Sequence, residues 1–539
     1  MTGDPGVESA PDVSPDGQWV VYGRVTGGTT HLFLQAVGGE RPLDLTGDAH
    51  GNAQPAFSPD GTQIAFRSGR GGGGLFVMGR TGELVRQVAD TGHWPAWSPD
   101  GTRLAYSSEH SVDAPFAYAG GGSVWTLDLG TGRKTRLTDH DATQPSWSPH
   151  DRRIAFWGVD PDTQNRDIWT VPVGGGPAVR ITNDAAIDAT PVWSADGGHL
   201  FFSSTRGGTT NLWRVPIDET SGAPLGPFQP VTVPTQHAVH PAVSRDGRRL
   251  VYVASSWTSD VYAMPFDVDR GATSGPARWI LGGPHHWGQL RASPDGSRLS
   301  AIRISHQRDL MVMGADGASP QRLTAEQGGV RCPAWSPDGR SISVLPTRRG
   351  ERDVILVDPD GGRIRRITDL PSTGLVGCPV WSRDGHGLLI VQGPADPAPL
   401  LFDPTRPVAG QTVDRLPSHP DGTFYPRNWS PDGRRIAGTI GNTIVIYDTV
   451  ARRYAFMPGA TRVLAAADMD WLPDGRRLLV MQDGRTVALV DTVSGDTRPV
   501  YLSTPDALRS FSLSVTRREL YVSRGPDESD VWIATIQTQ

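Results

Sequence analysis

The sequence has no run of 18 consecutive apolar residues, and its N-terminus lacks a charged segment followed by an apolar one. We therefore expect neither a membrane-spanning helix nor a signal peptide, and no membrane contact by the chain itself. The excess of one sign of charge is also small, because the formal net charge is only −6. A field this weak does not point to nucleic acid as a partner. Cysteine is limited to two residues, which fits either redox compartment.

Two hydrolase motifs are missing as well. The sequence contains neither G-x-S-x-G nor H-E-x-x-H, so neither a serine-hydrolase elbow nor a zinc-peptidase helix is expected. A G-x-G-x-x-G pattern occurs at residues 69–74, but it opens a strand rather than a helix. No helix N-terminus is then available to bind a phosphate, and we predict no cofactor.

Glycine and proline, in contrast, are abundant, with 65 and 46 residues. One short phrase, Ser-Pro-Asp-Gly or a close variant, recurs about every 45 residues. Its copies begin at Ser14, Ser58, Ser98, Ser148, Ser194, Ser244, Ser293, Ser336, Ser382, Ser430, Leu472 and, as a degenerate copy, Ser512. Proline fixes φ at the second turn position and glycine accepts the positive φ at the fourth, so the phrase predicts a β-hairpin turn.

Each repeat predicts four short strands. In one unit, apolar runs occupy residues 144–147, 154–157, 167–171 and 178–182, each bounded by turn residues. One small sheet cannot bury both of its faces, so repeated sheets pack face to face around an axis. The sequence therefore predicts an all-β fold, a β-propeller of twelve four-stranded blades.

Propellers usually have four to eight blades, so we predict two tandem six-bladed propellers, residues 1–282 and 283–539. A single twelve-bladed ring is the alternative, since no linker separates the halves. The last unit stops after its third strand, near Ile536, which predicts an open edge in the final blade. We infer that the chain is a piece of a longer protein whose upstream residues supply the missing outer strand.

Segments such as 95–106 and 333–339 resemble TolB-type (WD40-like, Pro-Asp) propeller repeats over essentially the whole chain. Segments 32–39, 211–218 and 528–532 resemble a narrower group, the extracytoplasmic propeller halves of bacterial serine/threonine protein kinases and winged-helix regulators. This resemblance implies a sensor domain in a membrane-anchored parent with an upstream effector domain. Kinase motifs are absent here, so kinase activity is not carried over, and a cytoplasmic location is the alternative.

The position four residues before each turn serine is predicted to line the channel mouth. It is varied and largely uncharged, which suits a small polar ligand or a peptide strand. The twelve residues are Ala10, Gln54, Trp94, Gln144, Thr190, His240, Gln289, Cys332, Cys378, Pro426, Asp468 and Leu508. From this set we predict Gln54, Trp94, Gln144, His240, Gln289 and Asp468 as ligand-binding residues, with simple hydration of the ring as the alternative.

Four histidines near these positions are weak candidates for a metal site: His237, His240, His285 and His286. Sugar-acid lyases on related propellers hold a divalent metal with such side chains, so a metal-dependent polysaccharide (oligogalacturonate-type) lyase is an alternative function. The turn aspartates repeat in every blade, and we interpret them as structural. The same holds for aspartates that precede third strands, such as Asp167 and Asp309, which we expect to bond loop backbone.

Cys332 and Cys378 occupy equivalent positions on neighbouring innermost strands. Such strands are often too far apart for a disulfide, so we expect free thiols, with a disulfide as the alternative. Taken together, these features predict a non-catalytic sensory propeller outside the cytoplasm that binds a protein, peptide or glycan. A structural scaffold of TolB type is a further alternative.

Overall fold

The computed structural model describes the chain except residues 1, 3–6, 27, 109–121, 161–164, 185, 233–236, 257, 284, 305–307, 325–328, 348–352, 362, 369–376, 392–397, 407–412, 458–462, 464–467, 527 and 537–539. The described residues form twelve antiparallel sheets and one short 3-10 turn, Arg70–Gly72. No helix in this part of the chain has the length and apolarity that a membrane span requires. The predicted all-β propeller is confirmed.

A typical blade contains strands β13 (Thr143–Trp147), β14 (Arg153–Val159), β15 (Arg166–Pro172) and β16 (Val179–Arg180), paired in that order. Strand β14 is buried over its whole length because it has a neighbour on each edge and a blade on each face. These four strands are the ones that the sequence predicts. Ten of the twelve sheets in the described residues are built in this way from four consecutive strands.

The repeated turn is held by one serine and one aspartate. In the turn at Ser98, the serine Oγ donates to Asp100 Oδ1 at 2.6 Å and accepts the Arg103 N–H at 2.9 Å. Gly101 has a φ of 74°, which a residue with a side chain would rarely adopt. The hydrogen bond from Ser98 lowers the pKa of Asp100. The predicted structural role of the turn aspartates is confirmed.

Aspartates of the third strands tie the outer edge of a blade. Asp167 accepts hydrogen bonds from Arg180 Nη2 at 2.6 Å and from Thr182 Oγ1 at 3.0 Å, and Asp309 pairs with Arg322 at 2.9 Å. These bonds go to side chains, whereas loop backbone was the expected partner. Antiparallel pairing places the fourth-strand residues beside the aspartate. Asp309 also accepts from Arg303, on the second strand of its blade, at 3.1 Å.

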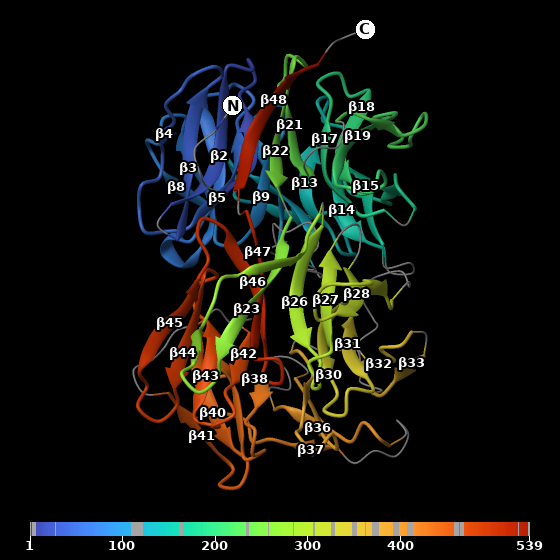
Figure 1. The fold of residues 1–539 in the computed structure, drawn as a ribbon. Helices are drawn as coiled ribbons and strands as arrows, with labels where there is room; N and C mark the ends of the chain where they lie inside the picture. The colour runs from blue at the N-terminus through green and yellow to red at the C-terminus, as the bar shows by residue number, and fades with distance from the viewer. Residues whose placement is uncertain are drawn as a thin grey trace. The chain divides into compact units, whose positions relative to one another are not determined.

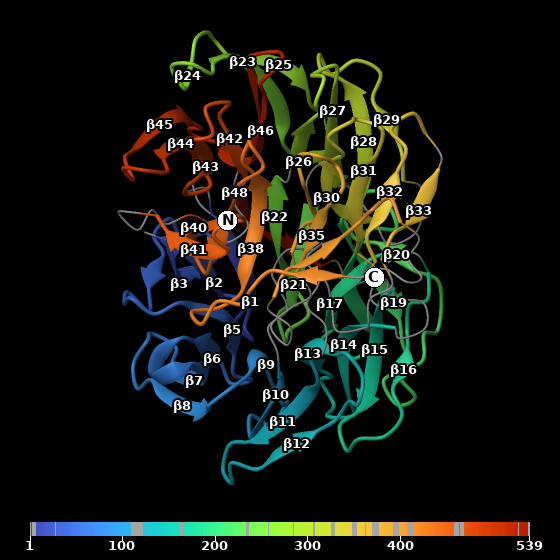
Figure 2. The same ribbon diagram turned by 90° about the horizontal axis from the view of Figure 1, so that it is seen from below.

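The chain divides into two compact units. Unit 1 contains Met1–Ser256 together with Asp527–Gln539. Its innermost strands contact one another in cyclic order, and the last one contacts the first, so the described part of unit 1 is a closed ring of six blades. These strands are β1 (Glu8–Val13), β5 (Asn52–Phe57), β9 (His93–Trp97), β13, β17 (Asp188–Trp193) and β21 (His237–Val243). Figure 2 shows the blades of this unit following one another from blue through cyan to green.

Unit 2 contains Trp257–Pro526 and is a second closed ring. Its six innermost strands also contact one another in cyclic order within the described residues. They are β26 (His286–Ala292), β30 (Val330–Trp335), β34 (Val380–Trp381), β38 (Phe424–Trp429), β42 (Met469–Trp471) and β46 (Ala507–Ser514). Two six-bladed rings are therefore present, and the alternative of one twelve-bladed ring is wrong.

The two units exchange strands (Figure 1). The C-terminal strand β48 (Glu528–Thr535) pairs with β22 (Arg249–Ser256) and completes the sixth blade of unit 1. In return, β23 (Asp260–Asp267) pairs with β47 (Glu519–Gly525) and completes the last blade of unit 2, with β25 (Arg278–Leu281) outside it. The red strand β48 beside the green strand β22 makes this exchange visible in Figure 1.

This exchange corrects the expected boundary between residues 282 and 283. The chain passes from unit 1 to unit 2 after Ser256 and returns after Pro526. Sequence repeats do not reveal this, because β23 and β48 are both third strands with the same apolar alternation. The expected lack of a fourth strand is found beside β48, which is the edge of a three-stranded sheet in the described residues of unit 1. The last blade of unit 2, in contrast, is completed by β23 and β25.

The N-terminus reaches the outer side of β48. Val7 forms a parallel bridge with Ser529, and the Val531 N–H donates to Thr2 Oγ1 at 2.8 Å.

One further expectation is corrected in the last repeat, where Ser514 rather than Ser512 occupies the turn position. Ser514 pairs with Glu519 at the start of β47, which is the five-residue offset of the other blades. The predicted channel residue Leu508 is accordingly replaced by Ser510.

Candidate functional site: the propeller channels

The channel of unit 1 contains a cavity of about 260 Å³. Its lining includes residues of all six innermost strands, among them the position four residues before each turn serine. In unit 1 these residues are Ala10, Gln54, Trp94, Gln144, Thr190 and His240. The sequence-predicted ring is thus assembled in this unit, and a proline follows each of its members.

All six of these residues have a φ between 46° and 57°, although none is glycine. Each lies where the pairing of the innermost strand with the second strand shifts register, as between Ser9 and Asp12. A bulge of this kind adds one residue to one strand and turns the side chain at the bulge. Positive φ at non-glycine residues is unfavourable and is retained where surrounding packing enforces it. The same geometry recurs at Gln289 and Cys332 in unit 2.

Trp94 and His240 contact each other inside unit 1. Their ring centroids are 5.3 Å apart with planes inclined at 40°. The two residues belong to the third and sixth blades, which lie opposite each other in a ring of six. The aromatic pair therefore spans the channel.

The glutamines of the predicted set bond within the protein. Gln54 Oε1 accepts the backbone N–H of Trp94 in the next blade at 2.9 Å. Gln144 accepts the indole N–H of Trp157 through its Oε1, and its own N–H donates to Ser107 Oγ at 3.0 Å. These bonds fix the bulge residues in place. They leave Trp94 and His240 as the predicted residues with the largest side chains toward the cavity.

Among the described residues that line the cavity, Asp12 and Arg245 are the charged ones. Asp12 Oδ2 accepts the Phe57 N–H at 2.6 Å, and burial raises the pKa of Asp12 to about 6. Arg245 follows a turn serine, where four other blades of unit 1 have proline. Its Nη2 donates to Pro99 O at 3.2 Å, again between the sixth and third blades.

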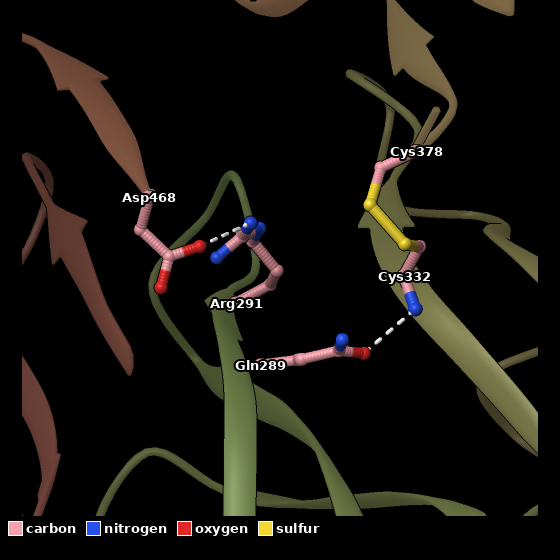
Figure 3. Close-up of a disulfide and its surroundings, with 5 residues drawn as sticks. All are labelled: Gln289, Arg291, Cys332, Cys378 and Asp468. Carbon is pink, nitrogen blue, oxygen red and sulfur yellow. Dashed lines mark hydrogen bonds and ion pairs between the residues drawn. A yellow bond between two sulfur atoms is a disulfide. The ribbon is translucent and has the colours of Figure 1, made fainter. Parts of the chain in front are cut away.

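The corresponding level of unit 2 is cross-linked by Cys332 and Cys378, whose Cα atoms are 5.2 Å apart (Figure 3). The expectation of free thiols is wrong, because the two innermost strands approach within the range that a disulfide requires. Gln289 Oε1 accepts the Cys332 N–H at 2.7 Å, the counterpart of the bond from Trp94 to Gln54. Figure 3 shows Arg291 beside this pair, with its guanidinium directed at Asp468.

Unit 2 has more charge at its centre than the sequence analysis indicated. Arg291 Nη2 and Asp468 Oδ1 are 2.8 Å apart. Burial alone would lower the pKa of Arg291, but the carboxylates of Asp468 and Asp470 outweigh burial and raise it. Burial raises the pKa of Asp470 to about 6. The sequence analysis does not include Arg291 and Asp470 among the channel residues. They lie two positions before the turn residues Ser293 and Leu472, whereas the predicted ring contains the residues four positions before each turn.

The predicted ligand-binding set is divided between the units. Gln54, Trp94, Gln144 and His240 belong to unit 1, whereas Gln289 and Asp468 belong to unit 2. The histidines are divided in the same way, with His237 and His240 in unit 1 and His285 and His286 in unit 2. The described residues contain no group of three or more His, Cys, Asp or Glu side chains placed to hold a metal ion.

The fold and its channels define the chain as a double six-bladed β-propeller. Residues 1–118, 94–274 and 228–402 match the TolB beta propeller domain family. The chain belongs to this family.

Relatives of known name include TolB proteins. An uncharacterized protein of Agrobacterium fabrum is 25% identical over 300 residues, which cover 54% of this chain and 83% of that protein. The Tol-Pal system protein TolB of Francisella tularensis subsp. mediasiatica is 26% identical over 217 residues, 39% of this chain. The match spans 48% of that protein, so about half of its length has a counterpart here.

Two solved structures are similar to the chain at low sequence identity and low TM-score. The putative TolB of Agrobacterium tumefaciens is 19% identical, with a TM-score of 0.26, over 62% of this chain and 88% of that one. The tricorn protease is 13% identical, with a TM-score of 0.35, over 99% of this chain and 61% of that one.

Proposed function

We propose that the chain is a non-catalytic binding protein that recognises a protein, peptide or glycan at the channel mouth of unit 1. The observation that carries the proposal is the cavity of about 260 Å³ to which all six blades contribute. Concave sites with mixed apolar and polar walls are the usual places for ligands. Membership of the TolB beta propeller domain family supports a binding or scaffold role.

We place the protein outside the cytoplasm. The disulfide between Cys332 and Cys378 supports this location, because disulfides persist in oxidising compartments. We further propose that the propellers serve as the sensor part of a larger signalling protein. This last step is supported by the resemblance of segments such as 211–218 and 528–532 to kinase-associated propellers.

We favour the binding role over the lyase alternative because of where the four histidines lie. A divalent metal needs several ligands in one place. His237 and His240 lie in one unit and His285 and His286 in the other, so neither unit by itself holds the four side chains.

Affinity capture tests the proposed function. The wild-type chain, a Trp94→Ala variant and a Leu225→Ser variant are immobilised and exposed to the same cell-envelope extract. Leu225 is 69% exposed on unit 1 and does not line the cavity, so it provides the matched control. We expect a bound species that the Trp94 variant loses and the Leu225 variant retains. Capture that survives the Trp94 substitution but not the Leu225 substitution would favour a scaffold acting through its outer edges.

A further inference from the structure

One turn in each propeller departs from the repeated phrase in the same way. Ser244-Arg245-Asp246-Gly247 in unit 1 and Ser382-Arg383-Asp384-Gly385 in unit 2 replace the proline by arginine. In unit 1 the other blades have Pro15, Pro59, Pro99, Pro149 and Ala195 at this position. All six residues line the cavity, so Arg245 adds a single guanidinium to a ring of proline side chains.

Arg245 directs this guanidinium over the cavity mouth. Its Nη2 donates to Pro99 O at 3.2 Å, in the blade opposite its own. An arginine has five N–H donors in a planar fork that matches a carboxylate. One bond to a carbonyl oxygen leaves most of these donors available at the turn end of the channel.

No carboxylate of the described residues forms an ion pair with Arg245. The neighbouring acid, Asp246, accepts instead from Ser244 Oγ at 2.5 Å. Burial lowers the pKa of Arg245, and no acidic side chain offsets the shift. Arg291 in unit 2 shows the opposite behaviour, because the carboxylates near it raise its pKa. Arg245 is an exposed residue, so its guanidinium can be reached by a ligand that supplies the negative charge.

We propose that Arg245 anchors a carboxylate-bearing ligand whose body occupies the cavity of unit 1. The carboxylate lies against the guanidinium at the mouth, and the organic part contacts the proline rings and the Trp94–His240 pair beyond them. The ligand is small, because the cavity measures about 260 Å³. Asp12 is the other charged lining residue, but its carboxylate is turned to the Phe57 N–H. This inference rests on the proposed function, because it names the ligand chemistry of the same channel mouth.

Two sources of the carboxylate are distinguishable by calorimetric titration of the full chain. Succinate represents a free small acid, and N-acetyl-Gly-Gly represents the end of a peptide. Succinamide and N-acetyl-Gly-Gly amide are the neutral controls. We expect one or both acids to bind in the millimolar range or tighter and the neutral analogues to bind at least about tenfold more weakly. Equal binding of an acid and its amide, or no binding of either acid, contradicts the proposal.

Arg245→Pro is the most informative variant, because it restores the residue that four other blades have at this turn. We expect it to reduce acid binding by about tenfold or more while thermal unfolding stays near that of the wild type. Arg245→Lys should restore part of the affinity, since it keeps the charge without the fork. Arg383→Pro makes the same replacement in unit 2, where the carboxylate of Asp470 is close to the arginine, and should leave acid binding unchanged. Binding that survives in Arg245→Pro overturns the proposal.

Discussion

Trp94 and His240 contact each other inside the channel of unit 1, with ring centroids 5.3 Å apart, although their blades face each other across the ring. Both residues are at bulges with positive φ, 54° for Trp94 and 51° for His240. The bulges therefore bring two large rings from opposite blades together in the channel, and both residues line the cavity.

This contact predicts an energetic coupling between the two blades. In a double-mutant cycle of Trp94→Ala and His240→Ala, we expect a coupling of about 0.5 to 1.5 kcal/mol, because aromatic pairs contribute this much beyond their buried area. Urea unfolding of the four proteins gives the value. Strict additivity of the two substitutions would show that the rings do not contact each other in solution.

Strand exchange makes the C-terminus essential to the first propeller. Val531 in β48 is fully buried against Val13, Tyr22 and Val251, all in unit 1. We expect Val531→Asp to lower the free energy of unfolding by more than about 3 kcal/mol, because an unpaired carboxylate would enter the core.

Trp532, the next residue, is 45% exposed and provides the control on the same strand. Trp532→Ser should change stability by no more than about 1 kcal/mol. Chemical unfolding measured by circular dichroism compares the two variants. Equal effects of the two substitutions would mean that β48 is not seated against unit 1.

The disulfide predicts a redox-dependent stability. Cys332 and Cys378 close a loop with a sequence separation of 46 residues. We expect the Cys332→Ser/Cys378→Ser variant to be less stable by about 2 to 4 kcal/mol, because the cross-link restricts the unfolded chain. Thiol titration of the denatured wild-type protein without reductant should find no free thiol, and two titratable thiols would contradict the structure.

Asp12 predicts a pH dependence with a definite sign. Burial raises the pKa of Asp12 to about 6, well above the ordinary range of an aspartate, so the folded protein binds this proton more tightly than the unfolded chain. Stability linked to Asp12 is therefore present at low pH and is lost as the pH rises toward and through about 6. Asp12→Asn removes the charge and retains an oxygen that can accept the Phe57 N–H.

We expect Asp12→Asn to gain stability relative to the wild type by about 1 to 2 kcal/mol at pH near 8, with the difference vanishing near pH 5. Urea unfolding at both pH values measures this. A variant that loses stability more strongly at the higher pH would reverse the sign and show that the ionised carboxylate is favourable in the fold.

Much of the fold could be predicted from the sequence because most blades are built from residues that are close together in the chain. The turn at Ser98 and the four strands from Thr143 to Arg180 follow from proline, glycine and alternation alone. The inward position of Trp94 and His240 follows from their shared offset from the turn serine. Such features depend on residues that are near one another in the chain.

Features between blades could not be predicted in this way. The partner of β22 is β48 rather than β23, and both strands offer the same apolar pattern to it. The approach of Cys332 to Cys378 depends on how tightly the innermost strands converge. Arg245 is visible in the sequence as a proline replacement, but its reach to Pro99 depends on ring closure. Contacts of this kind come from the packing of whole sheets.

The most direct test of the account is a cross-link between the exchanged strands. Arg249 and Thr535 are opposite each other in the pairing of β22 with β48, with Arg249 Nη1 and Thr535 Oγ1 at 3.0 Å. We predict that Arg249→Cys with Thr535→Cys forms a disulfide on mild oxidation, seen by peptide mapping. If β48 instead paired with β47 in the register that β23 uses, Thr535 would face Glu519. A cross-link in the Glu519→Cys/Thr535→Cys protein, and none in the first, would contradict the two closed rings.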